Sequence, residues 1–574
     1  MFRRRTFPGP PVPGSTTDKP DDEAKGLSNG LTVAMVGVAI LVFVAAAGIL
    51  AISRRTGLRR PHIVFILADD LGWNDVSYNG CPQIRTANID ALAWSGIRLR
   101  RYYTQSMCTP SRAALMTGRY PIHTGMQHFV LMEMEPRGLP LNFKLLPEWL
   151  GDLGYVRQML GKWHLGFYKK EYTPTMRGFQ KHIGSWGGFQ DYYSHQRDHP
   201  KVTLGGFDFR RGLLGGREFD GRYYTELMTE EAIRIIETHP LEKPLFLYLS
   251  HLAPHSGNRR DPLQVPKKFS DRYHDIGSRN RTLYAGKTSA LINASGAFTV
   301  LHRRTLYYRK VSLEPYKRSK QFKHNNTVMA KASLSRFTLF KPPETGWRTR
   351  RIQSEKERSP MRGGNTSVSC CPPSVRCLAG GVPSDIGNID GISQLEALSN
   401  GTEAPRKEVL INIDPIDNVT AIIEGHFKLV SGTVKGGALD DWFQIPGNVA
   451  WDTDRTRHEC ETSVAARVLR NSGHDVTCGS GQGSYAIPVK CGRRDKSKPC
   501  APTLAPCLFD LSEDPCEYNN VAEQHSARVR RLLGKLAVYR ATSWSPGNVP
   551  EDLRADPALH NDSWVSWGEV YPLL

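Results

Sequence analysis

Apolar runs alternate with amphipathic segments along most of the chain beyond residue 60. Residues 62–68 form a largely apolar run that ends at Asp69-Asp70, and residues 244–250 form a second run of this kind. Continuous runs of this length predict strands whose two faces are both buried, as in a parallel sheet. Helical spacing of apolar residues marks three other segments, residues 88–94, 145–153 and 224–238. Strands that alternate with helices predict an α/β sandwich with a mostly parallel central sheet.

The longest apolar run lies near the amino terminus, at residues 31–52. It contains 22 residues and no charged side chain, which is long enough to span a bilayer. We expect a transmembrane signal-anchor, because the 30 residues before the run exceed the usual lead of a secretory signal. A cleaved signal is the alternative. Basic residues on both sides leave the orientation of the run open. Residues 1–30 are rich in proline, glycine and charge, and we expect them to be disordered.

The formal net charge of +20 resides mainly in one segment. Residues 287–378 hold 19 Lys or Arg and 4 Asp or Glu, so 19 − 4 = 15 of the 20 excess charges lie there. The remainder is nearly balanced, which argues against a nucleic-acid partner. The same segment has few periodic stretches and no Asp, whereas strand patterns return at residues 407–413 and 425–430. The chain therefore divides into residues 61–286, an anomalous basic segment or long disordered loop, and residues 379–574.

Cys108-Thr-Pro-Ser-Arg112 is the first motif that suggests chemistry. Pro110 suits the first turn of a helix, where its missing N–H costs no hydrogen bond. Cys108 would then lie at the positive end of the helix dipole, where an anion is favoured. Arg112 follows by about one turn and is able to reach back toward that end. A buried free thiol without a chemical role is the alternative interpretation.

Two further groups of polar residues lie close to predicted strands. Asp69 and Asp70 follow the first apolar run, and paired carboxylates at a strand end suit a hard cation such as Ca²⁺ or Mg²⁺. Taken alone, such a pair is more often part of a loop or a helix cap. In Gly161-Lys-Trp-His-Leu-Gly166, an extended backbone would place Lys162 and His164 on one face. A solvated lysine and a histidine satisfied within the core are the alternatives.

Several stretches of the chain resemble one enzyme family. CTPSR at residues 108–112, followed by AALMTGR, is similar to the signature of type I sulfatases. TGRYPIHTGMQH, GKWHLGFYKKEYTPTMRGF and EKPLFLYLS resemble arylsulfatase B and its relatives, over about residues 61–286 and 379–574 in all. The resemblance implies an alkaline-phosphatase-like sulfatase sandwich with a smaller C-terminal α+β domain. It also implies hydrolysis of the 4-sulfate of N-acetylgalactosamine in dermatan and chondroitin sulfate, with an aryl sulfate as a further substrate. A phosphoesterase of the related fold is a weaker alternative, which CTPSR argues against.

The resemblance also implies roles for the polar residues. A formylglycine-generating enzyme would oxidise Cys108 to formylglycine before folding is complete, and the hydrated aldehyde has one hydroxyl to attack sulfur and a second to expel sulfate. Ca²⁺, rather than Mg²⁺, would bind at Asp69, Asp70 and residue 108 and offset the sulfate charge. The implied catalytic residues are Cys108, Arg112, Lys162, His164 and His255. His251 has no counterpart in the family pattern, and we expect it to be structural.

Two parts of the family pattern are absent from the sequence. Sulfatases complete the cation site with an Asp-Asn pair and add a second sulfate-binding lysine, and neither motif occurs here. No Asp lies between Asp275 and Asp385, and the one Asp-Asn pair, Asp417-Asn418, matches a later part of the family. Residues 287–378 therefore replace a family segment, through a gene-model or splicing error or in a divergent isoform. The chain is either an arylsulfatase B-like enzyme or a membrane-anchored pseudo-sulfatase without turnover.

Sequons and cysteines favour a body in the lumen of the secretory pathway or in the lysosome. Seven sequons occur, at Asn280, Asn293, Asn325, Asn365, Asn400, Asn418 and Asn561. Six of the 11 cysteines lie between Cys460 and Cys516, as in an oxidising compartment. Cys507 and Cys516 are close enough in sequence to close a small disulfide loop, and reduced thiols are the alternative.

Overall fold

The computed structural model describes residues 60–202, 205–293, 365–437, 452–479, 494–495 and 497–570. They belong to one compact unit that begins at Arg60. The expected disordered tail, residues 1–30, and the expected signal-anchor, residues 31–52, lie outside the described residues. Within the described ranges, no helix combines the length and the apolar character needed to cross a membrane.

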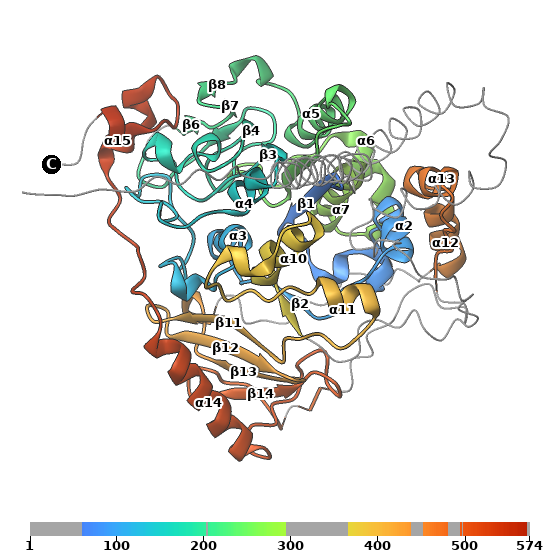
Figure 1. The fold of residues 1–574 in the computed structure, drawn as a ribbon, viewed down its shortest axis with the longest axis vertical. Helices are drawn as coiled ribbons and strands as arrows, with labels where there is room; N and C mark the ends of the chain where they lie inside the picture. The colour runs from blue at the N-terminus through green and yellow to red at the C-terminus, as the bar shows by residue number, and fades with distance from the viewer. Residues whose placement is uncertain are drawn as a thin grey trace, which may run out of the picture. The chain divides into compact units, whose positions relative to one another are not determined.

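A six-stranded sheet lies at the centre of this unit, with the strand order β1-β9-β3-β4-β7-β8 (Figure 1). Its strands are β1 (Ile63–Asp69), β9 (Leu245–Pro254), β3 (Val156–Gly161), β4 (Lys181–Gly184), β7 (Arg210–Arg211) and β8 (Leu214–Gly215). The first four are parallel, and β7 and β8 add an antiparallel edge. The two apolar runs that predicted buried strands form β1 and β9, which are paired neighbours. The predicted mostly parallel sheet is confirmed.

Helices pack on both faces of the sheet because successive side chains of β9 point to opposite faces. The helices are α3 (Cys108–Thr117), α4 (Leu146–Asp152) and α10 (Cys371–Leu378) on one face, and α5 (Tyr224–Thr238), α6 (Lys267–Ser270) and α7 (Arg279–Asn293) on the other. Phe246 and Tyr248 of β9 pack toward the first group, and Leu247 and Leu249 pack toward the second. All ten residues of β9 are buried, which accounts for its largely apolar sequence, in which Ser250 and His251 are the polar residues.

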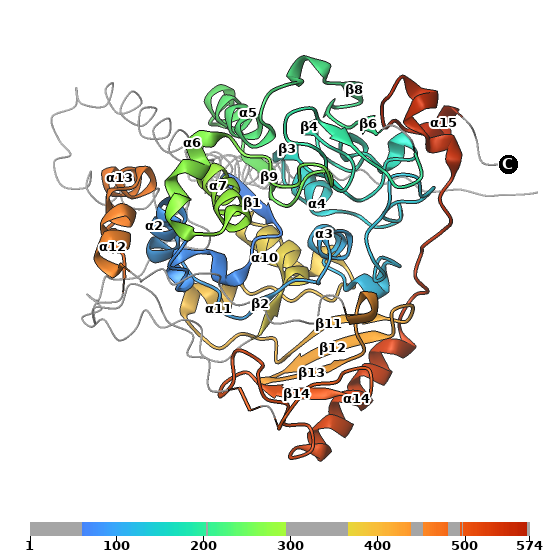
Figure 2. The same cartoon turned by 180° about the vertical axis from the view of Figure 1, so that it is seen from behind.

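A smaller antiparallel sheet follows toward the carboxyl terminus. Its strands are β11 (Glu408–Asp414), β12 (Val419–Glu424), β13 (Phe427–Ser431) and β14 (Cys507–Asp510), paired in that order. Helix α14 (Ser526–Ala541) lies along this sheet (Figure 2), and its Leu532 and Leu536 pack against Leu410 and Leu429. The expected smaller C-terminal α+β part is confirmed.

Short elements complete the described fold. They are α2 (Ala87–Ser95), α11 (Leu395–Asn400), α12 (Thr453–Thr462), α13 (Val464–Asn471) and α15 (Trp567–Val570), and the strand pairs β2 (Tyr102–Tyr103) with β10 (Thr366–Ser367) and β5 (Gln196–Arg197) with β6 (Gly206–Phe207). The predicted helices at residues 88–94, 145–153 and 224–238 correspond to α2, α4 and α5.

Both ends of the basic segment at residues 287–378 pack into this unit. Helix α7 continues through Lys287 to Asn293, and Lys287 is buried. At the other end, Val368 and Val375 belong to the apolar cluster that covers the first face of the sheet. Residues 294–364, between these two ends, lie outside the described residues.

The cysteine pairing differs from the sequence-based suggestion. Cys460 pairs with Cys478, and Cys507 pairs with Cys500. The suggested loop between Cys507 and Cys516 is therefore wrong. Cys507 opens strand β14, and the turn that precedes this strand brings Cys500 to a Cα–Cα distance of 5.6 Å, within disulfide range.

Gly161→Ala is expected to destabilise the fold strongly. Gly161 has φ +97°, and an added Cβ would lie 1.8 Å from the Ser250 carbonyl oxygen of β9. We expect the free energy of unfolding to fall by about 3 kcal/mol or more. Gly154→Ala is the matched control, because Gly154 has φ +78° but no atom within 4 Å of an added Cβ, and it should cost about 1–2 kcal/mol. Urea unfolding followed by tryptophan fluorescence measures both variants, and equal losses would contradict the steric argument.

Candidate active site

Polar residues at the ends of three adjacent strands meet at one edge of the central sheet. Asp69 is the last residue of β1, Lys162 directly follows β3, and His255 directly follows β9. These strands are parallel and neighbouring, so their carboxyl ends lie together. This edge is the usual position of ligand sites in open α/β sheets.

The start of α3 brings Cys108 to the same edge. Cys108 is the first residue of this helix, as the position of proline in the motif predicted. The Thr109 hydroxyl accepts a hydrogen bond from the Leu131 N–H at 3.0 Å and donates one to the His164 carbonyl at 3.2 Å. The beginning of the helix is thereby tied to the loop that follows β3.

Asp69, Lys162 and Arg112 form a buried charge cluster next to Cys108. Lys162 Nζ donates to Asp69 Oδ2 at 2.6 Å, and Arg112 donates to Asp69 Oδ1 at 3.2 Å and to Ser250 Oγ at 2.7 Å. Cys108 Sγ lies 3.3 Å from Lys162 Nζ and 3.5 Å from Asp69 Oδ1. Lys162 is 0% exposed and Arg112 2% exposed, so water hardly screens these charges. Two cations against one carboxylate give the cluster a positive excess, which suits an anion bound beside Cys108.

Burial has opposite consequences for Asp69 and Cys108. Burial alone would raise the pKa of Asp69, but the charges of Lys162 and Arg112 outweigh it and hold this pKa far below its usual range. Burial raises the pKa of the Cys108 thiol, and the lowering by Lys162 is partly offset by Asp69. The thiol is therefore protonated at neutral pH. The expectation that the helix terminus favours an anionic Cys108 does not hold for the thiol, because desolvation is the larger effect.

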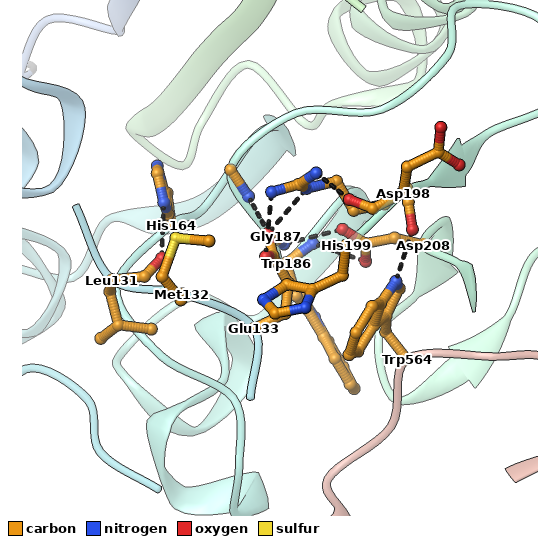
Figure 3. Close-up of polar contacts among 12 residues, drawn as sticks. Leu131, Met132, Glu133, His164, Trp186, Gly187, Asp198, His199, Asp208 and Trp564 are labelled. Atoms are coloured by element: carbon orange, nitrogen blue, oxygen red, sulfur yellow. Dashed lines mark hydrogen bonds and ion pairs between the residues drawn. The ribbon is translucent and has the colours of Figure 1, made fainter. Parts of the chain in front are cut away.

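His164 lies within the same group of residues, but its contacts differ from those expected. Residues 162–164 follow the end of β3 and His164 has φ +61°, so the assumption of an extended strand with Lys162 and His164 on one face is wrong. His164 Nε2 donates to the Leu131 carbonyl at 3.0 Å (Figure 3). Burial holds the pKa of His164 well below its usual value, so the ring is neutral. Nδ1 is then an acceptor, and it has no hydrogen-bond partner in the described part of the chain.

His255 lies close to Cys108, because one donor atom of each residue lies within 4.8 Å of the other. Its Nδ1 donates to the Ser256 carbonyl at 2.7 Å, and its Nε2 lies 3.5 Å from Asp70 Oδ2. The His255 ring stacks on Phe189, with centroids 5.3 Å apart. Burial and the charge of Lys162 lower the pKa of His255, and the carboxylates of Asp69 and Asp70 act against them. His255 thus faces the outer carboxylate of the predicted cation pair.

The donor atoms at this edge fit a hard cation only in part. One donor atom each of Asp69, Cys108 and His255 lie within 4.8 Å of one another, and Asp70 adjoins them. Ca²⁺ takes about six to eight oxygen ligands, whereas a thiol and an imidazole are softer donors. Asp417 does not contribute, because it lies with His128 and Asp414 in a separate cluster. Among the described residues, the set is incomplete for Ca²⁺ unless Cys108 is converted to an oxygen donor and further ligands come from elsewhere.

Three positions of this site were not predicted from the sequence. Ser250 accepts from Arg112, and Thr109 ties the helix start to β3, as described above. Lys287 is 0% exposed and its Nζ donates to the His255 carbonyl at 2.7 Å. Burial lowers the pKa of Lys287 to about 7, against the opposing charges of Asp261 and Asp191. A polar residue at the end of the second apolar run was the available signal for Ser250, but the contact of Lys287 depends on tertiary packing.

Comparisons with known proteins agree on one family. The sulfatase family profile matches residues 61–321. Arylsulfatase J from Mus musculus is 31% identical over 526 residues, which cover 89% of this chain and 81% of that protein. N-acetylgalactosamine-6-sulfatase from Mus musculus is 32% identical over 260 residues, 40% of this chain and 45% of that enzyme. The crystal structure of PsFucS1 sulfatase from Pseudoalteromonas sp. has the same fold, with a TM-score of 0.51 and 18% identity over 88% of this chain and 95% of that one.

Unmodified Cys108 in the folded protein is expected to react slowly with iodoacetamide at neutral pH. Burial raises the pKa of its thiol above the ordinary range, so the thiolate is scarce at pH 7 and increases only at strongly alkaline pH. Alkylation rates at several pH values, followed by peptide mass spectrometry, measure this dependence. Lys162→Gln should slow the reaction further, because it removes the charge that lowers the thiol pKa. A rate that already levels off below about pH 8 would show that the helix terminus dominates over burial.

Proposed function

The chain belongs to the sulfatase family, a family of sulfuric ester hydrolases, and we propose that it removes the 4-sulfate of N-acetylgalactosamine from glycosaminoglycans. The observation that carries this proposal is the 3.3 Å distance between Lys162 Nζ and Cys108 Sγ, beside the buried Arg112. A nucleophile at position 108 therefore lies next to fixed positive charge, which suits a sulfate ester that gains charge as it reacts. The likeness to an arylsulfatase and to an N-acetylgalactosamine sulfatase supports this substrate class.

The residues around Cys108 have distinct proposed roles. Formylglycine made from Cys108 supplies a hydrated aldehyde, whose hydroxyl forms the new bond to sulfur while the alcohol leaves with a proton. Lys162 binds a sulfate oxygen, and Arg112 fixes the carboxylate of Asp69 through its 3.2 Å contact. The neutral His164 ring has an unused acceptor at Nδ1, which is suited to a hydroxyl at position 108. His255 also contacts the bound sulfate.

Ca²⁺ is the proposed cation, with Asp69, Asp70 and an oxygen at position 108 as its ligands. Carboxylate oxygens favour a hard cation, and Ca²⁺ tolerates the irregular geometry of adjacent carboxylates better than Mg²⁺. The ligand number stays low, because residues 276–384 contain no Asp that would complete the set. We therefore expect weak binding in this chain.

A pseudo-sulfatase is the second candidate function, and one observation favours it. Each oxygen of Asp69 already accepts a hydrogen bond, one from Lys162 and one from Arg112, and within the described ranges Asp70 is the remaining carboxylate beside Cys108. A protein with this site could bind a sulfated glycan without hydrolysing it. The sulfate-binding charge of Lys162 would be retained in that case, and turnover would be lost.

The proposed location is the lumen of the secretory pathway or the lysosome, with residues 31–52 as a signal or a single-pass anchor. The Cys460–Cys478 and Cys500–Cys507 disulfides support an oxidising compartment. The sequon residues Asn280, Asn400 and Asn561 are exposed. Asn365 is different, because it is buried and its Nδ2 donates to the Gly425 carbonyl at 2.7 Å. We expect no glycan at that position of the folded chain.

Cys108 is expected to be converted to formylglycine when the chain is made in cells that contain the modifying enzyme. Pro110 and Arg112 complete the recognition motif around it, as the family resemblance implies. Peptide mass spectrometry should find the mass of the aldehyde at position 108. Cys81 is an internal control, because it is a free cysteine without this motif and should stay unmodified. Cysteine alone at position 108 would contradict the proposed nucleophile.

The chain as it stands is expected to show little or no arylsulfatase activity and weak Ca²⁺ binding. Fewer carboxylates lower the affinity for the cation, and the loss of one preorganised charge typically costs roughly 10²-fold in rate. A chain in which residues 287–378 are replaced by the corresponding segment of an arylsulfatase B relative should regain activity. Cys108→Ala in that repaired chain should abolish it again.

Hydrolysis of a chromogenic aryl sulfate and calorimetric Ca²⁺ titration measure both properties. Full activity and tight Ca²⁺ binding by the unaltered chain would overturn the argument from missing ligands. Residues 287–378 would then be a functional element of the enzyme.

A further inference from the structure

A pocket of about 300 Å³ opens beside His164. One wall is apolar and includes Val130, Met132 and Phe189. The buried His164 and the exposed Asp198 and Arg259 are also among its lining residues. The volume is that of a small-molecule site. A group bound there would adjoin the residues that surround Cys108, because the carbonyl of His164 is tied to Thr109.

Glu133, which lines the pocket, and Asp208, which does not, belong to a network of buried, paired polar groups (Figure 3). Glu133 receives two hydrogen bonds from Arg197, at 3.0 and 3.1 Å, and a third from the Gly188 N–H at 3.0 Å. The Asp208 carboxylate accepts hydrogen bonds from the backbone N–H groups of Trp186 and Gly187, at 3.0 and 2.7 Å. These buried charges are satisfied within the protein, so they shape the pocket and are not available to a ligand.

Two charged side chains of the pocket remain available. Arg259 and Asp198 are both exposed, and within the described residues neither the guanidinium of Arg259 nor the carboxylate of Asp198 has an ion-pair or hydrogen-bond partner. Only the backbone of Asp198 contacts side chains: its N–H donates to Asn258 Oδ1 at 3.0 Å, and its carbonyl accepts from Arg197. Their neighbours are engaged: Arg197 is held by Glu133, and His199 Nε2 lies 3.0 Å from Glu551 Oε1. The mouth of the pocket therefore offers one unpaired cation and one unpaired carboxylate.

Phe189 joins this pocket to the second histidine of the site. The Arg197 guanidinium lies 3.7 Å from the centroid of the Phe189 ring, and the His255 ring stacks on Phe189. Phe189 thus lines the pocket and contacts His255, which is not itself a lining residue. A molecule whose sulfate ester is held beside Cys108 would extend its remaining atoms into this space.

We propose that this pocket binds the sugar that carries the sulfate ester, and that Arg259 recognises a second anionic group on the same glycan. The apolar wall suits the face of a pyranose ring, Asp198 is an acceptor for ring hydroxyls, and Arg259 matches a carboxylate or a second sulfate. An aryl sulfate has no second anion for Arg259. The inference rests on the proposed sulfatase site, and it narrows the substrate class to glycans with at least two anionic groups.

Direct binding tests this proposal on the whole chain, because slow turnover leaves the ligands intact. Calorimetry would compare three ligands: a chondroitin 4-sulfate tetrasaccharide, the same tetrasaccharide with reduced carboxyl groups, and N-acetylgalactosamine 4-sulfate. Arg259→Gln should lower the binding affinity for the tetrasaccharide by about fivefold to tenfold, as expected for one charged hydrogen bond. The same substitution should leave the affinity for the monosaccharide unchanged. Arg260→Gln is the matched control, because Arg260 is adjacent and exposed but does not line the pocket.

The outcomes distinguish the role of Arg259 from the proposed sulfatase function. If Arg259→Gln does not change the affinity for the carboxyl-reduced tetrasaccharide, the anion that Arg259 recognises is a carboxylate. If the substitution still lowers that affinity, the anion is a sulfate. Equal effects of Arg259→Gln and Arg260→Gln on the tetrasaccharide would overturn the role of Arg259 while leaving the sulfatase site intact. No binding of any of the three ligands to the unaltered chain would overturn the proposed function and this inference together.

Discussion

The buried contact of Asp69 with Lys162 and Arg112 is the constraint on which the rest of the site depends. It joins the ends of β1 and β3 to helix α3, and Arg112 extends it to Ser250 of β9. Removing one partner would leave a buried charge without compensation, which typically costs about 3–5 kcal/mol. The pKa of Asp69 is lowered in the folded state, so the contact stabilises the fold at neutral pH and loses its effect only as the pH falls toward that lowered value. Fold stability and the positive charge beside Cys108 thus come from the same three side chains.

Local sequence predicted several elements, namely β1, β9, α2, α4 and α5, and the sheet edge at which the candidate residues meet. The runs at residues 62–68 and 244–250 are largely apolar and form β1 and β9. Every residue of β9 is buried, whereas β1 has both buried and half-buried residues. Parallel strands carry their carboxyl ends to one edge, which is why Asp69 and His255 lie together although far apart in sequence. Periodicity and strand direction account for this part of the prediction.

The remaining features depend on contacts between distant segments. The raised pKa of Cys108 follows from desolvation by surrounding elements, which a helix-dipole argument at one position does not include. His164 donates to Leu131, a loop residue without any distinctive pattern, so the orientation of its ring could not be foreseen. The pairing of Cys507 with Cys500 depends on a turn before β14, and the pocket at Arg259 exists only where several loops converge. Roles of individual residues remain predictions for the same reason.

The contact between Arg112 and the distant Ser250 also has a consequence for the biosynthesis of the protein. The hydrogen bond from Arg112 to Ser250 joins residues 138 positions apart, so the strand that completes the site is made long after the segment around Cys108. At a translation rate of about 5–20 residues per second, that delay is roughly 7–28 s. During this interval Cys108 cannot yet be enclosed by β9, and the nascent segment is accessible as an unfolded peptide. The order of synthesis therefore sets a time window for any enzyme that modifies Cys108, and later strand docking closes it.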